Sequence, residues 1–362
     1  MPELYNVAIV GAGPIGIELH AALEEAGYHV FHADAGPIGH TMRWWAPGTT
    51  FFSSPERIAI CGSSRTTAAQ GKLTGEAYIR SLVDVVRGRG LIIHPFRAVT
   101  AIRRDESFFE LDTQRSREGL GGEGTESLTT YGPIDTVRAH AVVLTIGNMH
   151  RARRLGIPGE DLPHVSHYLD DPLRHVGRSV LVVGGKNSAV EAAIRLHRVG
   201  AGVTLSYRNP EFDAERVKPW LLPELKWLID KGRIRFLPET VPMRIDADRV
   251  TLHGPKGETE LRPDAVRLLT GYGQDQTLFD QLGVERLGDI RRPAYDHDTM
   301  ETSVPGVYVA GTACGGSQTR ARVFIENSHI HVDRICRALT GQGVPWALDQ
   351  DFAGLGGADE ER

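Results

Sequence analysis

The fold is decided near the N-terminus by the stretch Val7-Ala8-Ile9-Val10-Gly11-Ala12-Gly13-Pro14-Ile15-Gly16. Its first four residues are apolar, as in a strand buried on both faces, and its last six match the pattern GxGxxG. In such a turn the first glycine allows a tight bend, the second lets the backbone approach a pyrophosphate, and the third lets a helix pack closely on the strand. The N-terminus of that helix then binds the anion through its free N–H groups.

The residues after this turn complete a strand, helix, strand unit. A helix is expected over Ile17–Gly27, then a short strand over Tyr28–Ala33 that ends at Asp34. Farther along the chain, a helix is expected over Thr74–Arg89, with Thr74 as its cap. Asp34 lies eighteen residues beyond Gly16, near the spacing at which a carboxylate accepts hydrogen bonds from an adenosine ribose. The alternative is a βαβ unit that binds no nucleotide. The residues expected to hold the first dinucleotide are Gly11, Gly13, Pro14, Gly16 and Asp34.

An internal repeat predicts a second nucleotide fold. The stretch 180–189 restates the opening stretch at a constant offset of 173 residues, which aligns Gly11 with Gly184 and Gly16 with Ala189. The second unit ends its next strand with Arg208 instead of an acid, and an arginine there can pair with a 2′-phosphate. This favours NADPH over NADH, unless Arg208 is a solvated surface residue. The residues expected at this site are Gly184, Gly185, Asn187, Ser188, Ala189, Arg208 and Gly271.

Composition narrows the class of protein. The chain has 362 residues, a formal net charge of −5 and no run of about 18 apolar residues, so neither nucleic acid nor a membrane is expected as a partner. We expect a cytoplasmic protein, since no secretory leader is recognisable. Its three cysteines are far apart and contain no CxxC, which argues against a disulfide framework and a zinc ribbon. No metal site is expected.

The order of these elements resembles a known family. Two βαβ units in series, a strand ending at Thr145–Gly147 and a late strand over 305–311 are similar to two-domain FAD/NAD(P)H flavoproteins of the low-molecular-weight thioredoxin reductase type. The resemblance implies an α/β fold with two Rossmann-like domains, in which an NADPH domain is inserted into a discontinuous FAD domain. The expected ranges are 1–155 and 272–362 for the FAD domain and 156–271 for the NADPH domain.

The same resemblance assigns further FAD contacts. It implies that Thr145, Gly147 and Gly311 line the FAD site, and that a helix following Ala310-Gly311 brings backbone N–H groups to the flavin. That helix is expected over Thr319–Leu339. Thr312 stands where the family usually has an aspartate that bonds the ribityl chain, so it replaces or weakens that contact.

A closer similarity is to the YpdA-type branch, the bacillithiol-disulfide reductases. The segments that carry it are 50–54, 157–163, 165–168, 187–193 and 324–327. Two departures bear on mechanism. Thioredoxin reductases carry a CxxC before the second glycine turn, where this chain has His167 and Asp170, and the YpdA branch has a GPCG cysteine where this chain has Ile15.

The resemblance implies NADPH-dependent reduction of an acceptor through FAD, with a small disulfide of the bacillithiol type as substrate. Because both family cysteines are missing, a ferredoxin or other redox-protein reductase and a flavin-dependent monooxygenase are alternatives, and a non-catalytic nucleotide-binding sensor is an alternative of another class. His167 is a candidate proton donor or a scaffold residue, and Cys314 a candidate redox thiol or an inert one. The acceptor is expected to be a small molecule or a small redox protein, and the protein a homo-oligomer.

Overall fold

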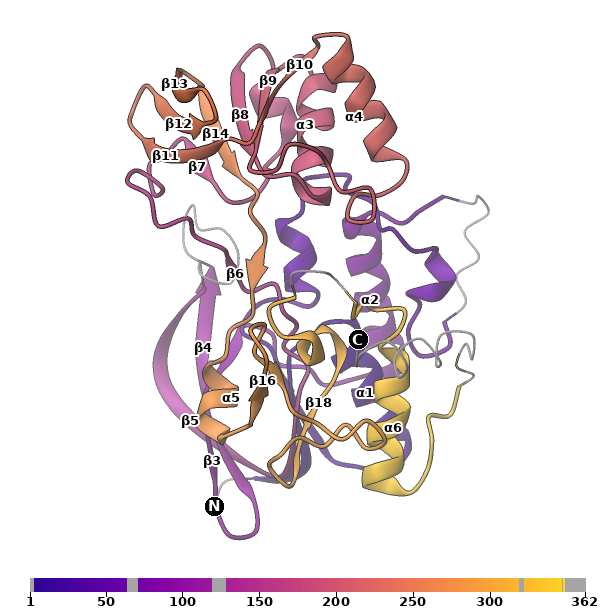
Figure 1. Cartoon of the computed structure of the whole chain (residues 1–362). Coiled ribbons are helices and arrows are strands. Elements are labelled where there is room, and N and C mark those ends of the chain that lie inside the picture. Colours follow the sequence, from indigo (N-terminus) through magenta and orange to yellow (C-terminus); the bar gives the residue numbers. More distant parts are fainter. Residues whose placement is uncertain (1–2, 64–70, 119–127, 319–321, 347, 349–362) are drawn as a thin grey trace. The chain divides into compact units, whose positions relative to one another are not determined.

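The computed structural model describes residues 3–63, 71–118, 128–318, 322–346 and 348. The chain divides into two compact units (Figure 1). The first unit comprises Met1–Arg43, Gly48–Arg151 and Gly273–Arg362, and the second comprises Trp44–Pro47 and Ala152–Tyr272. The second unit is therefore an insertion in the first, and each is built around its own mainly parallel sheet covered by helices. The predicted fold class is confirmed.

The first unit is built on a six-stranded sheet in the order β2-β1-β5-β4-β3, with β18 also paired to β5. β1, β2 and β18 run parallel to β5, whereas β3 and β4 form an antiparallel extension. Val7–Val10 of β1 is almost completely buried, which requires a central place in a sheet covered on both faces. The strands are β1 (Leu4–Val10), β2 (Val30–Ala33), β3 (Arg97–Arg104), β4 (Phe109–Glu118), β5 (Leu128–Leu144) and β18 (Val307–Val309).

The helices of the first unit begin and end at local sequence signals. α1 starts with Pro14 at its first position, directly after the extended Gly13. The side chain of Thr74 accepts a hydrogen bond from the Ala77 N–H and caps α2, as the sequence predicts, and Gly90 ends that helix with a left-handed backbone. The helices are α1 (Pro14–Glu25), α2 (Gly75–Arg89), α5 (Thr277–Leu282) and α6 (His329–Thr340), with short 3₁₀ helices η1 (His40–Trp44), η2 (Pro55–Arg57) and η5 (Gly311–Gly315).

The expected helix over Thr319–Leu339 is wrong in its first half, because α6 begins only at His329. Residues 319–321 lie outside the described part of the chain. In the segment before α6, the Asn327 side chain accepts a hydrogen bond from the Phe324 N–H and donates one to the Arg322 carbonyl. These side-chain bonds compete with helical hydrogen bonds and hold a turn instead. No helix among the described residues is long and apolar enough to cross a membrane.

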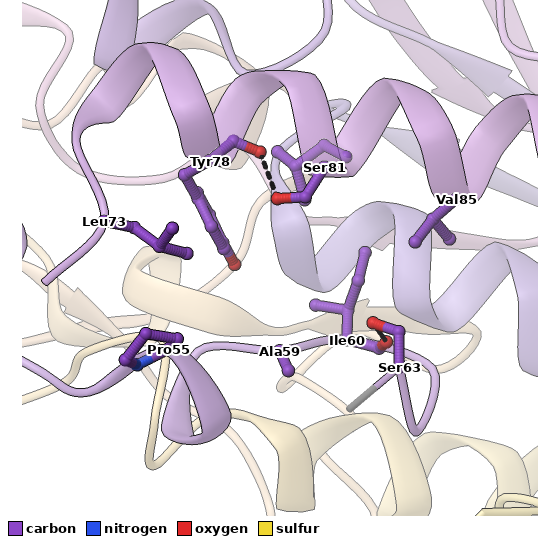
Figure 2. A pocket seen from close by; sticks show the side chains of 9 residues that line it. Pro55, Ala59, Ile60, Ser63, Leu73, Tyr78, Ser81 and Val85 are labelled. Carbon is purple, nitrogen blue, oxygen red and sulfur yellow. Dashed lines mark hydrogen bonds between the residues drawn. The ribbon is translucent and has the colours of Figure 1, made fainter. Parts of the chain in front are cut away.

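A small apolar pocket lies beneath α2 in the first unit (Figure 2). Its polar groups are satisfied within the protein: Ser63 donates to the Ile60 carbonyl, and Ser81 donates to the Tyr78 carbonyl. Tyr78 itself is buried and donates to the Ile58 carbonyl. Because no convergent set of polar groups points into this pocket, it carries no chemistry that we can assign.

The second unit has a five-stranded parallel sheet in the order β10-β9-β8-β14-β7. Alternate residues of β8 face opposite sides: Val180 and Val182 pack with α3 and α4, whereas Leu181 and Val183 pack with a three-stranded sheet, β11-β12-β13. The elements are β7 (Val165–Ser166), η4 (Pro172–His175), β8 (Ser179–Val183), α3 (Asn187–Arg198), β9 (Gly202–Tyr207), α4 (Leu221–Asp230), β10 (Ile234–Pro238), β11 (Val241–Ile245), β12 (Val250–Gly254), β13 (Gly257–Leu261) and β14 (Ala265–Leu268).

The two places where the chain crosses between the units after β5 form a paired ribbon. β6 (Arg151–Ala152) carries the chain out and β15 (Tyr272–Gly273) carries it back, and the two strands pair. A second short ribbon, β16 (Arg286–Leu287) with β17 (Arg292–Pro293), follows in the first unit.

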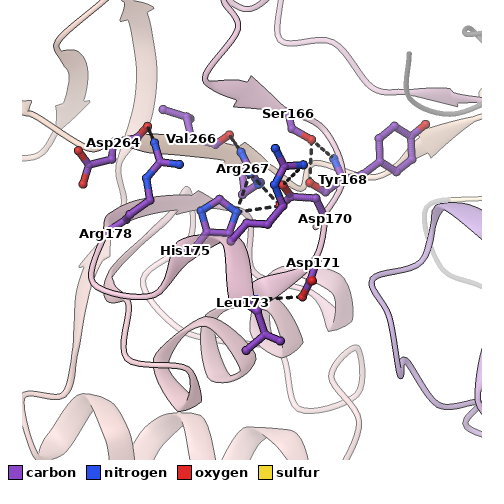
Figure 3. A network of polar contacts seen from close by, with 11 residues as sticks. Ser166, Tyr168, Asp170, Asp171, Leu173, His175, Arg178, Asp264, Val266 and Arg267 are labelled. Carbon is purple, nitrogen blue, oxygen red and sulfur yellow. Dashed lines mark hydrogen bonds and ion pairs between the residues drawn. The ribbon is translucent and has the colours of Figure 1, made fainter. Parts of the chain in front are cut away.

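A buried ionic cluster fastens η4 to the sheet of the second unit (Figure 3). Arg267, on β14, is 5% exposed, and its Nη2 donates to Asp170 Oδ1 at 2.8 Å. His175 Nε2 lies 2.8 Å from the same oxygen. Burial opposes ionisation of Asp170, but the contacts with His175 and Arg267 outweigh it and hold the pKa of this carboxyl below its ordinary value of 3.8. The negative charge of the Asp170 carboxylate therefore balances the positive charge of the buried Arg267 guanidinium.

Asp170→Asn is expected to lower the free energy of unfolding by about 2–3 kcal/mol at neutral pH, because it leaves the buried Arg267 without its counter-ion. The folded pKa of Asp170 is below the unfolded value, so this stabilisation is present above that value and is lost as pH falls through the folded pKa. The difference in the free energy of unfolding between wild type and Asp170→Asn should therefore become smaller at acidic pH. Urea unfolding across a pH series measures both effects.

Asp161→Asn is the matched control. Asp161 pairs with Arg154 in the same unit, but its side chain is 80% exposed, so its loss should change stability by less than about 1 kcal/mol. Equal destabilisation by the two variants would contradict a special role for the buried cluster.

Candidate active site

The first glycine turn is shaped by close backbone contacts. Gly11 has φ +113°, and a Cβ on it would lie 2.5 Å from the Thr145 carbonyl oxygen. A Cβ on Gly16 would lie 2.1 Å from the Gly11 carbonyl oxygen. Gly13 differs, because a Cβ there would meet nothing within 4 Å. Gly11 and Gly16 are thus required by the fold, whereas Gly13 leaves open space beside the N-terminus of α1, as a pyrophosphate needs.

Asp34 lies beside this turn, as the βαβ spacing predicts. Its Oδ2 accepts a hydrogen bond of 2.6 Å from the Ala12 N–H, and its Oδ1 accepts one of 2.7 Å from the Gly36 N–H. Burial raises the pKa of Asp34 to about 6, although both N–H groups favour the ionised form. The carboxylate therefore holds the turn in place, and its remaining lone pairs are available to ribose hydroxyls.

The other expected FAD residues lie at the same edge of the first sheet. Thr145 follows β5, and its hydroxyl donates to the Gly11 carbonyl at 2.7 Å. Gly147 and Thr312 follow the neighbouring strands β5 and β18, and a Cβ on Gly147 would lie 3.7 Å from Thr312 Oγ1. The carboxyl ends of adjacent parallel strands form the usual ligand site of such folds. The structure therefore brings these residues together with the glycine turn.

The geometry around Gly311 differs from the expectation. The short η5 helix follows β18 instead of a long helix, and the Gly311 N–H donates to His331 Nδ1 on α6 at 3.2 Å. That N–H is therefore engaged within the protein. The Cys314 sulfur lies 3.8 Å from the same nitrogen. Burial lowers the pKa of His331 to about 3, so this imidazole is neutral and its Nδ1 accepts the hydrogen bond from the Gly311 N–H.

All three cysteines are thiols that lie buried in the first unit. Cys314 is 1% exposed and packs in the core of the first unit, and the helix expected after it begins only at His329. Burial raises the pKa of Cys61 and of Cys336 to about 12. Neutral buried thiols are poor nucleophiles. Ile15, at the place of the GPCG cysteine, is also buried and packs against Gly311.

The residues at the position of the family dithiol serve other purposes. His167 lies in the second unit, where its Nε2 accepts a hydrogen bond of 3.0 Å from Arg154 and is 3.6 Å from Glu160. An imidazole that accepts at Nε2 is not a proton donor at that atom. Asp170 belongs to the ionic cluster with Arg267. Neither residue is a thiol, and Figure 3 shows the contacts of Asp170 with His175 and Arg267.

In the second glycine turn, as in the first, close contacts leave no room for side chains at two positions. Gly184 has φ +142°, and a Cβ on it would lie 2.5 Å from the Leu269 carbonyl oxygen. A Cβ on Gly185 would overlap the ring of Tyr207 at 2.3 Å. Asn187 and Ser188 begin α3, and Asn187 Oδ1 accepts a hydrogen bond of 2.7 Å from the Lys218 N–H. Asn187 thus ties the loop after β9 to this turn.

Several cations gather around the second turn. Burial lowers the pKa of Lys186, and the charges of Arg216, Arg153 and Arg208 lower it further. Asp213 is the acidic group that acts against them, and it also pairs with Arg216 at 2.9 Å. Gly271 lies beside Arg153, because a Cβ on it would be 3.8 Å from Arg153 Cδ. Such an excess of positive charge favours a bound phosphate.

Sequence reasoning missed Arg153 and Arg216. Arg153 precedes the second turn by about thirty residues and Arg216 follows the β9 strand inside an irregular loop, so no local spacing marks them. No group of three or more His, Cys, Asp or Glu residues able to hold a metal occurs within the described residues.

Comparison with known proteins agrees with this architecture. The chain is 30% identical over 326 residues to the bacilliredoxin reductase Bdr of Bacillus subtilis, covering 89% of this chain and 94% of that protein. It is 31% identical over 317 residues to a ferredoxin–NADP reductase of Ignicoccus hospitalis, covering 84% and 89%. The bacillithiol disulfide reductase Bdr (YpdA) from Bacillus cereus superposes with a TM-score of 0.86 at 27% identity, over 94% of this chain and 99% of that one.

The predicted resemblance to YpdA-type and thioredoxin reductase-like flavoproteins is confirmed, and so is the predicted enzyme class, an NADPH-dependent flavoprotein oxidoreductase. The family model for pyridine nucleotide-disulphide oxidoreductases matches residues 8–118 and 124–311. This protein therefore belongs to the pyridine nucleotide-disulphide oxidoreductase family.

Proposed function

We propose that this protein is an FAD-dependent NADPH oxidoreductase that reduces its acceptor at the flavin without a cysteine relay. The observation that carries the proposal is the burial of Cys61, Cys314 and Cys336, together with Ile15 in the first turn. A bound FAD takes a hydride from NADPH and delivers two electrons to an acceptor. The protein's part is to bind and orient the two dinucleotides.

In this proposal the first unit holds FAD. The open space at Gly13 and the N-terminus of α1 receive the pyrophosphate, and Asp34 orients the adenosine ribose. Thr145, Gly147, Gly311 and Thr312 line the same edge of the sheet. These residue types fit FAD. Gly11 and Gly16 allow the tight turn, and Gly13 leaves room for the pyrophosphate.

The second unit holds NADPH in this proposal. Gly184 and Gly185 form the turn, Asn187, Ser188 and Ala189 open α3, and Gly271 follows β14 at the same sheet edge. Lys186, Arg153, Arg208 and Arg216 supply positive charge around it. A 2′-phosphate relieves the mutual repulsion of these cations, which a free ribose hydroxyl does not.

The acceptor that fits best is a redox protein of the ferredoxin type, because such a partner needs no protein thiol. The similarity to ferredoxin–NADP reductases supports this choice. A second candidate is a small disulfide of the bacillithiol type, which the similarity to Bdr favours. In that reaction NADPH, a proton and one disulfide give NADP⁺ and two thiols, with the electrons passing directly from the flavin.

The decisive experiment reconstitutes the protein with FAD and mixes it anaerobically with NADPH. We expect loss of the visible flavin absorbance, followed by its return when oxidised ferredoxin is added. Return with a bacillithiol-type disulfide instead would support the second acceptor, and return only with oxygen and a hydroxylated product would indicate a monooxygenase. A flavin that neither NADPH nor NADH reduces would indicate a non-catalytic sensor and overturn the proposal.

Replacing Arg208 and Arg216 together by leucine tests the nucleotide preference. We expect the KM for NADPH to rise about 10- to 100-fold, because charge-assisted hydrogen bonds to a phosphate are lost, while the KM for NADH changes little. Steady-state kinetics with both nucleotides measures the ratio. Arg198→Leu is the control, since Arg198 lies on α3 but pairs with Glu224 at an exposed position. A parallel loss with NADPH and NADH would argue against 2′-phosphate recognition.

A triple variant, Cys61→Ala, Cys314→Ala and Cys336→Ala, tests the absence of a thiol relay. We expect acceptor reduction per bound flavin to stay within about twofold of wild type, because thiols buried in the protein take no part in the proposed electron transfer. Normalising the rate to bound flavin removes any effect on folding. A tenfold or larger loss per flavin would show that one of these thiols carries electrons.

A further inference from the structure

Gln274 is a buried residue whose side-chain amide connects two loops of the first unit. It follows β15, where the chain returns from the inserted unit, and it is 7% exposed. Its Nε2 donates to the Gly147 carbonyl at 3.0 Å and to the Ala313 carbonyl at 2.8 Å. A single amide therefore links the loop after β5 to the loop after β18.

The orientation of this amide is unambiguous. A carbonyl oxygen only accepts hydrogen bonds, so the atom that contacts both carbonyls must be the NH₂ group. The Gln274 Oε1 then accepts a hydrogen bond of 2.9 Å from Gln276 Nε2. A flipped amide would place Oε1 against two other acceptors. Gln274 thus uses both donors and one acceptor in a fixed geometry.

The backbone around Gln274 is attached to the same two loops. The His150 N–H donates to the Gly273 carbonyl at 3.2 Å, and the Asp275 N–H donates to His150 Nδ1 at 3.1 Å. On the other side, the Gln274 N–H donates to Ser317 Oγ at 2.9 Å. The backbone at Gln274 is therefore held from both sides, which fixes the point from which its side chain reaches the two loops.

The loops that Gln274 joins are the ones that line the proposed flavin site. Gly147 has φ +76° and lies beside Thr312, and Ala313 is the next residue of η5. The spacing between these loops sets the wall of the site, because β5 and β18 are neighbouring parallel strands. We propose that Gln274 is a positioning residue of the flavin site, which fixes the distance between the two loops. This inference rests on the proposed function, since it requires FAD at this edge.

Two substitutions separate hydrogen bonding from packing. Gln274→Met keeps the length of the side chain and removes the hydrogen bonds, whereas Gln274→Glu keeps the shape and turns a carboxylate toward two carbonyl oxygens. We expect the dissociation constant for FAD to rise at least about tenfold in the methionine variant and further in the glutamate variant. The visible spectrum and the midpoint potential of the bound flavin should shift as well, because the loops change their spacing.

Gln281→Met is the matched control. Gln281 also bridges two backbone groups of the first unit, accepting from the Ile102 N–H and donating to the Thr100 carbonyl, but it does so between α5 and β3. Because Gln281 is exposed, we expect this variant to lower the melting temperature of the FAD-free protein by less than Gln274→Met does. FAD affinity, flavin spectrum and midpoint potential should stay unchanged.

The outcomes are distinct. Wild-type protein that binds no FAD would refute the proposed function and this inference with it. Wild-type protein that binds FAD, with both Gln274 variants unchanged in affinity, spectrum and potential, would overturn the inference alone. Equal weakening of FAD binding by the Gln274 and Gln281 variants would reveal a general loss of stability and would also overturn it.

Discussion

The first unit depends on the close approach of the Gly11 turn to the end of β5. The carbonyl oxygen of Gly11 accepts hydrogen bonds from the Thr145 hydroxyl and from His32 Nε2, and the Ala12 N–H donates to Asp34. A side chain at Gly11 would collide with the Thr145 backbone. The Gly11 carbonyl and the Ala12 N–H are therefore engaged within the protein, and the open space at Gly13 is left for a ligand. The rest of the proposed flavin site is arranged around this contact.

The second unit has a glycine turn of similar backbone geometry but with more positively charged surroundings. Its glycine turn packs against Leu269 as the first packs against Thr145, but the space that a second glycine leaves open in the first turn is given to Lys186. The surrounding arginines make this turn strongly cationic. Positive charge at the end of a parallel sheet, near a helix N-terminus, discriminates between nucleotides by their phosphates.

The resemblance noted in the sequence places the cysteines of thioredoxin reductases and of the YpdA branch at positions where this chain has other residues. Ile15 fills the turn position with an apolar side chain, and Asp170 forms an ion pair with Arg267 where a dithiol would stand. Cys314 is buried, and its sulfur lies 3.8 Å from Nδ1 of the neutral imidazole of His331. Ile15 lies within the first turn, but the three glycines of that turn, Gly11, Gly13 and Gly16, are all present. In the proposed function, electrons pass from the flavin to the acceptor without a protein thiol.

The sequence by itself determined the features that local spacing encodes. The two glycine turns, the offset of 173 residues between them, the strand ends at Asp34 and Arg208 and the Thr74 cap all follow from residues close together in the chain, because turns, caps and βαβ units obey short-range stereochemistry. Only the tertiary structure decided that Gln274 joins Gly147 to Ala313, that Arg153 and Arg216 approach Lys186, and that Cys314 is buried against His331. These contacts join side chains that are far apart in the sequence and come from separate strand ends and loops. The burial and the local charge of such side chains depend on how the sheet places its strand ends beside one another. No short sequence pattern encodes that arrangement.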